Sequence, residues 1–139
     1  MKVLLDTNII VDIALERQPY ITNSETVLAF VEQGQIEGYI SASTISDLYY
    51  LIRKQKGRDL TIEFLRQIVR FCQIATVNQA VITMALTANF RDFEDAIQYS
   101  TAVLNQLDAI ITRNPQDFTA ITPRILTPEQ LIQELTNSP

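Results

Sequence analysis

Short apolar runs alternate along the chain with longer segments in which apolar residues recur every three or four positions. The short runs are typical of strands buried on both faces, and the longer segments are typical of amphipathic helices. Strands separated by helices indicate a parallel sheet covered by helices on both faces. The pattern predicts a three-layer α/β/α sandwich with a central, mostly parallel sheet, formed as a single domain by residues 1–139. The predicted strands are Val3–Leu5, Tyr39–Ser41, Ile74–Val77, Ala109–Thr112 and Ile125–Leu126.

Side chains that can cap a helix precede most of the helical segments. Glycines at positions 34 and 57 are expected to end the second and third helices. One more helix is predicted from about Thr61 to Phe71. The predicted caps are Thr7 or Asn8, the capping box Thr22-Asn23-Ser24-Glu25, Ser43 or Thr44, Asn78, Asp92, and the capping box Thr127-Pro128-Glu129-Gln130.

Composition narrows the class of protein. The chain has 139 residues, 47% of them apolar, and a formal net charge of −5. This length supports one hydrophobic core, and the apolar content is too high for a disordered protein. No apolar run approaches the roughly 18 residues of a membrane span, and Asp6 interrupts the first run too early for a signal peptide. We therefore expect a cytoplasmic protein with no membrane association.

Two scarce residue types limit the chemistry. The chain has no histidine, which excludes Ser-His-Asp and Cys-His catalysis and histidine-bound zinc. Its single cysteine, Cys72, lies among apolar residues and is interpreted as a buried, inert thiol. A catalytic site would have to use carboxylates, hydroxyls, amides and basic side chains. Oxygen ligands of this kind favour Mg²⁺ or Mn²⁺.

Acidic and amide side chains follow several of the predicted strands. Asp6 ends the first strand, Asp47 lies shortly after the second, and Asn114 and Asp117 follow the fourth. Asp95 lies in the first turn of a helix that can point its N-terminus at the same edge of the sheet. Converging carboxylates repel one another unless a cation neutralises them, and a bound Mg²⁺ activates water for attack on phosphorus. The pattern predicts a metal-dependent phosphoester hydrolase at the carboxyl edge of the sheet.

Each acid also has a structural explanation. Asp6 could have a purely structural role, in which its carboxylate accepts hydrogen bonds from the backbone amides of the next helix. Asp47 stands three residues after Thr44, so it is equally explained as the carboxylate of a capping box. We interpret Asp92 as the helix cap and Asp95 as the site residue. Two further acids, Asp12 and Glu94, are assigned to the solvent-facing surface.

Four motifs occur in the order and at the distances found in one nuclease family. They are Met1-Lys2-Val3-Leu4-Leu5-Asp6-Thr7-Asn8-Ile9-Ile10, Ser41-Ala42-Ser43-Thr44-Ile45-Ser46-Asp47-Leu48, Asp92-Phe93-Glu94-Asp95-Ala96-Ile97-Gln98-Tyr99, and Leu107-Asp108-Ala109-Ile110-Ile111-Thr112-Arg113-Asn114-Pro115-Gln116-Asp117-Phe118. Over nearly the whole chain, this arrangement resembles PIN-domain ribonucleases, including the VapC-type toxins of bacterial toxin–antitoxin pairs.

The resemblance implies a PIN-like fold and a metal-dependent endoribonuclease. It assigns Asp6, Asp47 and Asp95 to an acidic triad around Mg²⁺ or Mn²⁺, and it implies a homodimer with an antitoxin partner. Polar helpers would be Thr7 or Asn8, together with Thr112. The sequence departs from the family pattern at two positions, where Asp47 replaces the usual glutamate and Asn114 replaces a frequent aspartate. Asn114 adds no negative charge, so it favours one bound metal ion over two, unless Asp117 reaches the site.

The net negative charge of the chain would repel the phosphates of an RNA substrate, so RNA binding requires locally placed basic side chains. We expect Arg113, beside Asn114, to contact a phosphate, and a basic stretch formed by Arg53, Lys54, Lys56 and Arg58 is a further candidate. One alternative is a PIN-like module that binds RNA without cutting it. Another is an aspartate-based phosphohydrolase or phosphoacceptor domain. Asn8 and Asn78 argue against that second alternative, because they stand where such proteins need a further aspartate.

Overall fold

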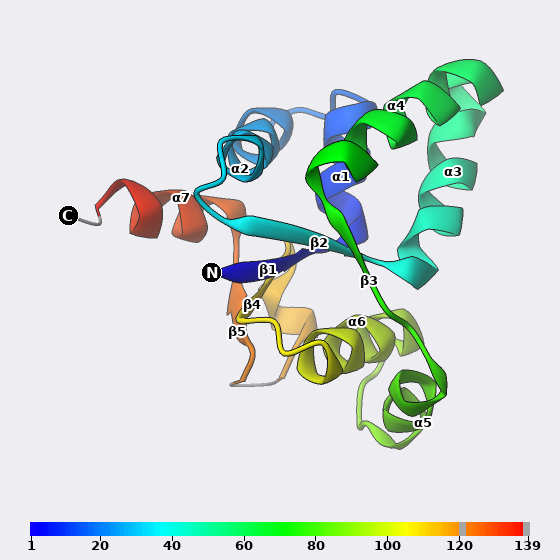
Figure 1. The fold of residues 1–139 in the computed structure, drawn as a ribbon, viewed down its shortest axis with the longest axis vertical. Coiled ribbons are helices and arrows are strands. Elements are labelled where there is room, and N and C mark those ends of the chain that lie inside the picture. The colour runs from blue at the N-terminus through cyan, green and yellow to red at the C-terminus, as the bar shows by residue number, and fades with distance from the viewer. Residues whose placement is uncertain (120–121, 138–139) are drawn as a thin grey trace.

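The computed structural model describes residues 1–119 and 122–137, and its centre is a parallel sheet (Figure 1). Five strands pair in the order β3-β2-β1-β4-β5, and every pairing is parallel. This confirms the predicted α/β class and parallel sheet. The strands are β1 (Lys2–Leu5), β2 (Glu37–Ser41), β3 (Gln73–Ala75), β4 (Ala109–Ile111) and β5 (Arg124–Leu126).

Helices cover both faces of the sheet and form two outer layers (Figure 1). One layer contains α1 (Thr7–Ala14), α2 (Ile21–Glu32), α3 (Ala42–Lys56), α4 (Arg58–Phe71) and α7 (Pro128–Thr136), and the other contains α5 (Gln79–Thr87) and α6 (Phe93–Leu104). A short 3₁₀ helix, η1 (Pro115–Asp117), follows β4. Within the described residues, no helix is long and apolar enough to cross a membrane.

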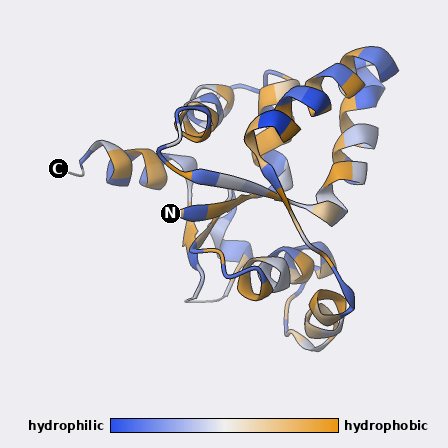
Figure 2. Cartoon of the chain, in the orientation of Figure 1, coloured by the Kyte–Doolittle hydropathy of each residue, from blue (hydrophilic) through white to orange (hydrophobic). Residues whose placement is uncertain are grey.

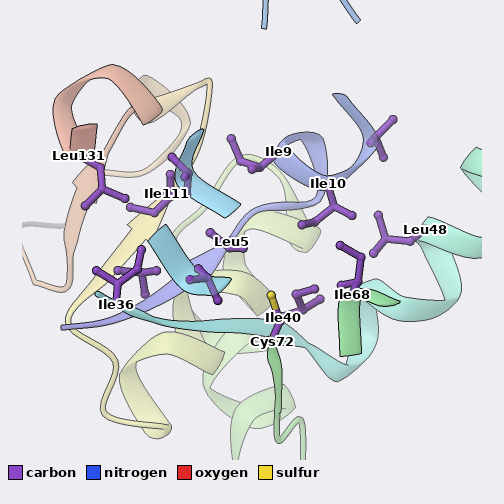
Figure 3. Packing of buried hydrophobic residues seen from close by; sticks show 14 of the residues in the cluster. Leu5, Ile9, Ile10, Ile36, Ile40, Leu48, Ile68, Cys72, Ile111 and Leu131 are labelled. Carbon is purple, nitrogen blue, oxygen red and sulfur yellow. The ribbon is translucent and has the colours of Figure 1, made fainter. Parts of the chain in front are cut away.

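The alternation of side chains along each strand divides the core into two parts. Val3 and Leu5 of β1 belong to the larger cluster, beneath α1 to α4 and α7, whereas Leu4 belongs to the smaller cluster, beneath α6. Figure 3 shows the larger cluster, where side chains from α1, α3 and α4 meet those of the sheet. Cys72 lies there with 2% of its surface exposed, and burial raises the pKa of its thiol to about 12, as expected for an inert cysteine.

The central position of β1 brings distant segments together at the carboxyl edge of the sheet. Leu5 of β1 lies opposite Ile111 of β4, and the Asp6 amide donates to the Ile111 carbonyl at 3.0 Å. The residues that follow these two strands, Asp6 and Thr112, are therefore neighbours across the edge. The helices α1 and α3 begin at this edge, directly after β1 and β2.

Several helix starts differ from the sequence prediction. Asp6, rather than Thr7 or Asn8, is the N-cap of α1, and Ser41, rather than Ser43 or Thr44, is the N-cap of α3. Helix α2 begins at Ile21 without a side-chain cap, so the predicted capping box does not form. The predicted caps Asn78, Asp92 and Thr127 are confirmed, as is the end of α3 at Gly57, whose φ is +81°.

The basic stretch lies where α3 leads into α4. Figure 2 shows hydrophilic residues gathered at this end of the two helices, away from the sheet. Because α3 rises about 1.5 Å per residue, its 15 residues place Lys56 roughly 20 Å from the edge where the helix begins. Lys56 and Arg58, at the far end of this stretch, therefore lie away from the edge of the sheet that carries Asp6.

Candidate active site

The buried carboxylate of Asp6 is the centre of a hydrogen-bond network at the carboxyl edge of the sheet. It accepts from the Thr112 hydroxyl at 2.7 Å, the Thr7 amide at 2.8 Å, the Gln98 Nε2 at 3.3 Å and the Asn8 Nδ2 at 3.5 Å. The first donor follows β4, two belong to the start of α1, and Gln98 belongs to α6. The position of this carboxylate is thus fixed by three separate parts of the chain.

Burial costs the ionised form of Asp6 free energy. Only 8% of the residue is exposed, and desolvation raises the pKa of its carboxyl group. The hydrogen bonds from Thr112, Thr7 and Gln98 act in the opposite direction, and the charge of Asp117 raises the pKa further. The net pKa is above its ordinary value, so the site favours anything that neutralises this negative charge.

Five of the predicted site residues line one cavity beside Asp6, which we call the Asp6 cavity. Its volume is about 330 Å³. The predicted residues that line it with Asp6 are Thr7, Asn8, Asp95, Asn114 and Asp117, and the others are Val11, Arg17, Leu51, Asp92, Glu94 and Gln98.

The pKa of Asp95 is strongly raised by its surroundings in this cavity. Burial raises its pKa first, and the charges of Asp6, Asp92, Asp117 and Glu94 raise it further, to about 7. Its neighbour Asp92 caps α6 by accepting from the Asp95 amide at 3.1 Å. Asp92 is therefore the cap of α6, as predicted, and both Asp92 and Asp95 line the Asp6 cavity.

Asp47, the third member of the expected triad, lies in an adjoining cavity. This second cavity has a volume of about 310 Å³ and is lined by Asp47, Ser43, Phe93 and Ile97, with Thr7, Thr44, Glu94 and Gln98. Since Ser41 caps α3, Asp47 stands in the second turn of the helix rather than the first. Thr44 is not a cap, so Asp47 does not act as a capping-box carboxylate. The structure brings Asp6 and Asp95 together and places Asp47 beside them.

The expected phosphate contact of Arg113 does not match its position. Its Nε lies 2.7 Å from Asp12 Oδ2, and its guanidinium lies 4.0 Å from the centre of the Tyr20 ring. Asp12 is fully buried, which corrects its assignment to the surface, and desolvation raises its pKa despite the opposing effects of Arg113 and Arg17. Arg113 therefore connects α1 to the loop after β4. Arg17 lies farther from the same carboxylate, with 3.9 Å between its Nη1 and Asp12 Oδ1, and it also lines the Asp6 cavity.

Sequence reasoning missed two residues that lie within the site. Gln98 is 4% exposed and stands three positions after Asp95, so it shares the inward face of α6. This spacing from a candidate acid was the available signal. Glu94 is exposed but lines both cavities, and its pKa is raised by partial burial and by the charges of Asp47, Asp92 and Asp6. Nothing in the local sequence distinguishes it from a surface glutamate.

The donor set suits a hard divalent cation. All candidate ligands are oxygens, and burial together with neighbouring carboxylates raises the pKa values of Asp6 and Asp95, so a cation that neutralises them would be favoured. Two buried amide oxygens, Asn8 Oδ1 and Gln98 Oε1, have no hydrogen-bond partner among the described residues. In that same part of the chain, no three His, Cys, Asp or Glu side chains stand close enough to hold a metal ion together. Mg²⁺ commonly uses only one or two carboxylates and keeps several waters.

Known proteins provide an independent comparison. A family model described as PIN domain matches residues 2–116. The chain is 26% identical over 137 residues to Ribonuclease VapC1 of Aquifex aeolicus (strain VF5), covering 95% of this chain and 94% of that protein.

Two solved structures share the fold. VapBC2 from Rickettsia felis, bound to a DNA fragment from its promoter, matches with a TM-score of 0.63 and 19% identity, over 91% of this chain and 97% of the other. Mycobacterium tuberculosis VapC20, described as a sarcin-ricin loop cleaving toxin, matches with a TM-score of 0.62 and 8% identity, over 78% and 86%. Because the matched family model covers most of the sequence, this chain belongs to the PIN domain family.

Proposed function

We propose that this chain is a divalent-cation-dependent endoribonuclease that hydrolyses RNA phosphodiester bonds. The observation that carries the proposal is the gathering of Asp6, Asp95, Asn114 and Asp117 around one cavity at the carboxyl edge of a parallel sheet. The similarity to Ribonuclease VapC1 over nearly the whole of both chains supports it.

The proposal gives roles to the acidic and polar residues in and around the Asp6 cavity. Asp6 and Asp95 hold the cation, and Asp47 approaches it from the adjoining cavity through water. Bound Mg²⁺ or Mn²⁺ supplies positive charge that polarises the phosphoryl group and lowers the pKa of a water molecule. Asn114 and Asp117 orient the attacking water. Thr112 acts beneath the cavity, where its hydroxyl donates to Asp6 and accepts from the Asn114 amide at 3.1 Å.

RNA would enter through a larger neighbouring cavity. This cavity has a volume of about 640 Å³ and shares Asp92, Asp95 and Asp117 with the Asp6 cavity. We assign phosphate contacts to Arg91 in the larger cavity and to Arg17 in the Asp6 cavity. The remaining residues of the larger cavity are Asn89, Phe90, Gln116 and Thr119.

The same reasoning extends to the biological role. We propose that the chain is the toxin of a toxin–antitoxin pair, that it binds an antitoxin protein, and that it forms a homodimer. The description of its structural neighbour VapC20 as a sarcin-ricin loop cleaving toxin supports the first of these. Expression of the chain alone should arrest bacterial growth, and co-expression of the product of the adjacent reading frame should restore it.

The activity test is cleavage of labelled RNA. Purified protein should cut single-stranded RNA in Mn²⁺ or Mg²⁺ and stop in EDTA. Asp6→Asn should abolish cleavage without unfolding the protein, because asparagine caps helices as well as aspartate does. Glu25→Gln, an exposed residue on α2, removes the same charge and should leave activity unchanged. Full activity of Asp6→Asn would contradict the assigned roles, and cation-dependent RNA binding without cleavage would favour the RNA-binding module.

A further inference from the structure

Gln98 is a buried polar residue at the boundary between the Asp6 cavity and the adjoining cavity of Asp47. It is 4% exposed and lines both cavities. A buried amide is costly unless its donors and acceptor are satisfied. Leucine or methionine would fill the same volume at no such cost. The contacts of Gln98 should therefore explain why an amide stands there.

The amide nitrogen of Gln98 joins three helices at one point. Nε2 lies 3.1 Å from the Thr44 hydroxyl, 3.3 Å from Asp6 Oδ1 and 3.4 Å from the Thr7 hydroxyl. These three partners belong to α3, to the N-cap of α1 and to its first residue, respectively. The Thr7 and Thr44 hydroxyls also lie 3.4 Å from each other. Gln98 thus connects the Asp6 carboxylate to α3, the helix that carries Asp47.

The amide oxygen of Gln98 has a different environment. Oε1 is buried and has no hydrogen-bond partner among the described residues. An acceptor left unpaired inside a protein costs about 1–3 kcal/mol in typical cases. Because Gln98 faces the cavities that carry the carboxylates, a bound cation or one of its waters would satisfy this oxygen.

We propose that Gln98 is a positioning residue of the cation site, acting through Asp6, and this rests on the proposed function. Its Nε2 holds Asp6 Oδ1 in one orientation and ties it to Thr44. Its Oε1 is a neutral, buried oxygen that has no hydrogen-bond partner among the described residues. Side chains that orient metal ligands typically change metal affinity by 10- to 100-fold when they are removed. Loss of Gln98 should therefore weaken cation binding even in the absence of RNA.

The test measures Mn²⁺ binding to RNA-free protein by calorimetry and by electron paramagnetic resonance of free Mn²⁺. Gln98→Met keeps the size of the side chain and removes both polar atoms, and it should raise the Kd for Mn²⁺ about tenfold. Thr101→Val is the matched control, because Thr101 is a fully buried residue of the same helix whose hydroxyl bonds the Ile97 carbonyl at 2.6 Å. Thr101→Val should lower the urea concentration at the midpoint of unfolding and leave the Kd for Mn²⁺ unchanged.

A second variant keeps the proposal testable if Gln98→Met does not fold. Thr44→Val removes one anchor of the Gln98 amide without touching Asp6, and it should raise the Kd for Mn²⁺ two- to threefold. In the double variant with Gln98→Met, the Thr44 change should have no further effect, because its partner is already gone. Additive effects would instead indicate independent packing roles.

The outcomes separate this inference from the proposed function. A wild-type protein that binds Mn²⁺, with Gln98→Met or Thr44→Val binding it within the error of the wild-type Kd, would overturn the role of Gln98 and leave the nuclease proposal intact. A wild-type protein that binds no Mn²⁺ at millimolar concentration would overturn both. A higher Kd for Mn²⁺ in both variants, with the Kd of the Thr101→Val control equal to that of wild type, supports the inference.

Discussion

The cluster of carboxylates should make the metal-free protein less stable at neutral pH, and Asp95→Asn should relieve this. The pKa of Asp95 is about 7 in the folded protein, against an ordinary value of 3.8. The folded state therefore binds the Asp95 proton more tightly than the unfolded state does. Stability contributed by this group is fully present below about pH 4 and is lost as the pH rises toward and through 7.

The magnitude follows from the same two pKa values. Their difference corresponds to about 4 kcal/mol if the whole effect reaches the folding equilibrium. Asp95 is only partly buried, so solvent screening reduces this to about 1–2 kcal/mol. The negative charge of Asp95 also interacts favourably with the N-terminus of α6. The Asp95→Asn variant loses this interaction, at a cost of about 0.5 kcal/mol. We expect Asp95→Asn to raise the free energy of unfolding by about 1 kcal/mol at pH 7.5.

Urea denaturation in EDTA, from pH 4 to pH 8, measures this effect. Asp95→Asn should match wild type near pH 4 and exceed it above pH 7, whereas Glu25→Gln should follow wild type throughout. Millimolar Mg²⁺ should stabilise wild type and have a smaller effect on Asp95→Asn, because ligand binding to the folded state shifts unfolding by mass action. A variant that is no more stable than wild type at pH 7.5 would refute the electrostatic account.

Three further predictions concern individual side chains. Thr112→Val should lower kcat for RNA cleavage about 10- to 100-fold with little change in KM, and Thr112→Ser should restore it, because the hydroxyl orients a carboxylate of the site; equal activity of the valine variant would contradict this. Asp12→Ala should lower the free energy of unfolding by about 3 kcal/mol in urea, since it leaves Arg113 without its buried partner, whereas Asp59→Ala at an exposed ion pair should change it little. Cys72 should not react with Ellman's reagent at pH 8 until urea unfolds the protein, and rapid reaction of the native protein would show that the thiol is accessible.

The sheet was predictable because each strand contains a short apolar stretch that lies between helical segments in the sequence. From that topology alone, the carboxyl edge could be identified as the place where Asp6, Asn114 and Asp117 meet. Capping chemistry placed the start of α6 at Asp92 and therefore turned Asp95 toward the cavity. These inferences depend on local spacing and on general properties of parallel sheets, both of which are visible in the sequence.

The remaining details depend on tertiary contacts that local sequence does not encode. Asp12 has the spacing of a surface residue on a short helix, but its partner Arg113 is 101 positions away. Three hydroxyls stand within four residues at the start of α3, and the choice of Ser41 as cap moves Asp47 into the second turn. Gln98 becomes a site residue only because α6 packs its inward face against the ends of β1 and α3.

The order of the strands has a consequence for when the active site can form during synthesis. β1 is made before the other four strands of the sheet, yet its neighbour β4 begins at Ala109, more than 100 residues later. Until that strand is made, Asp6 lacks the hydroxyl of Thr112 and the loop that contributes Asp117. A nascent chain would therefore carry Asp6 without a cleavage centre while the residues between β1 and β4 are made, so the proposed nuclease could act on RNA only after the segment that follows β4 has been synthesised.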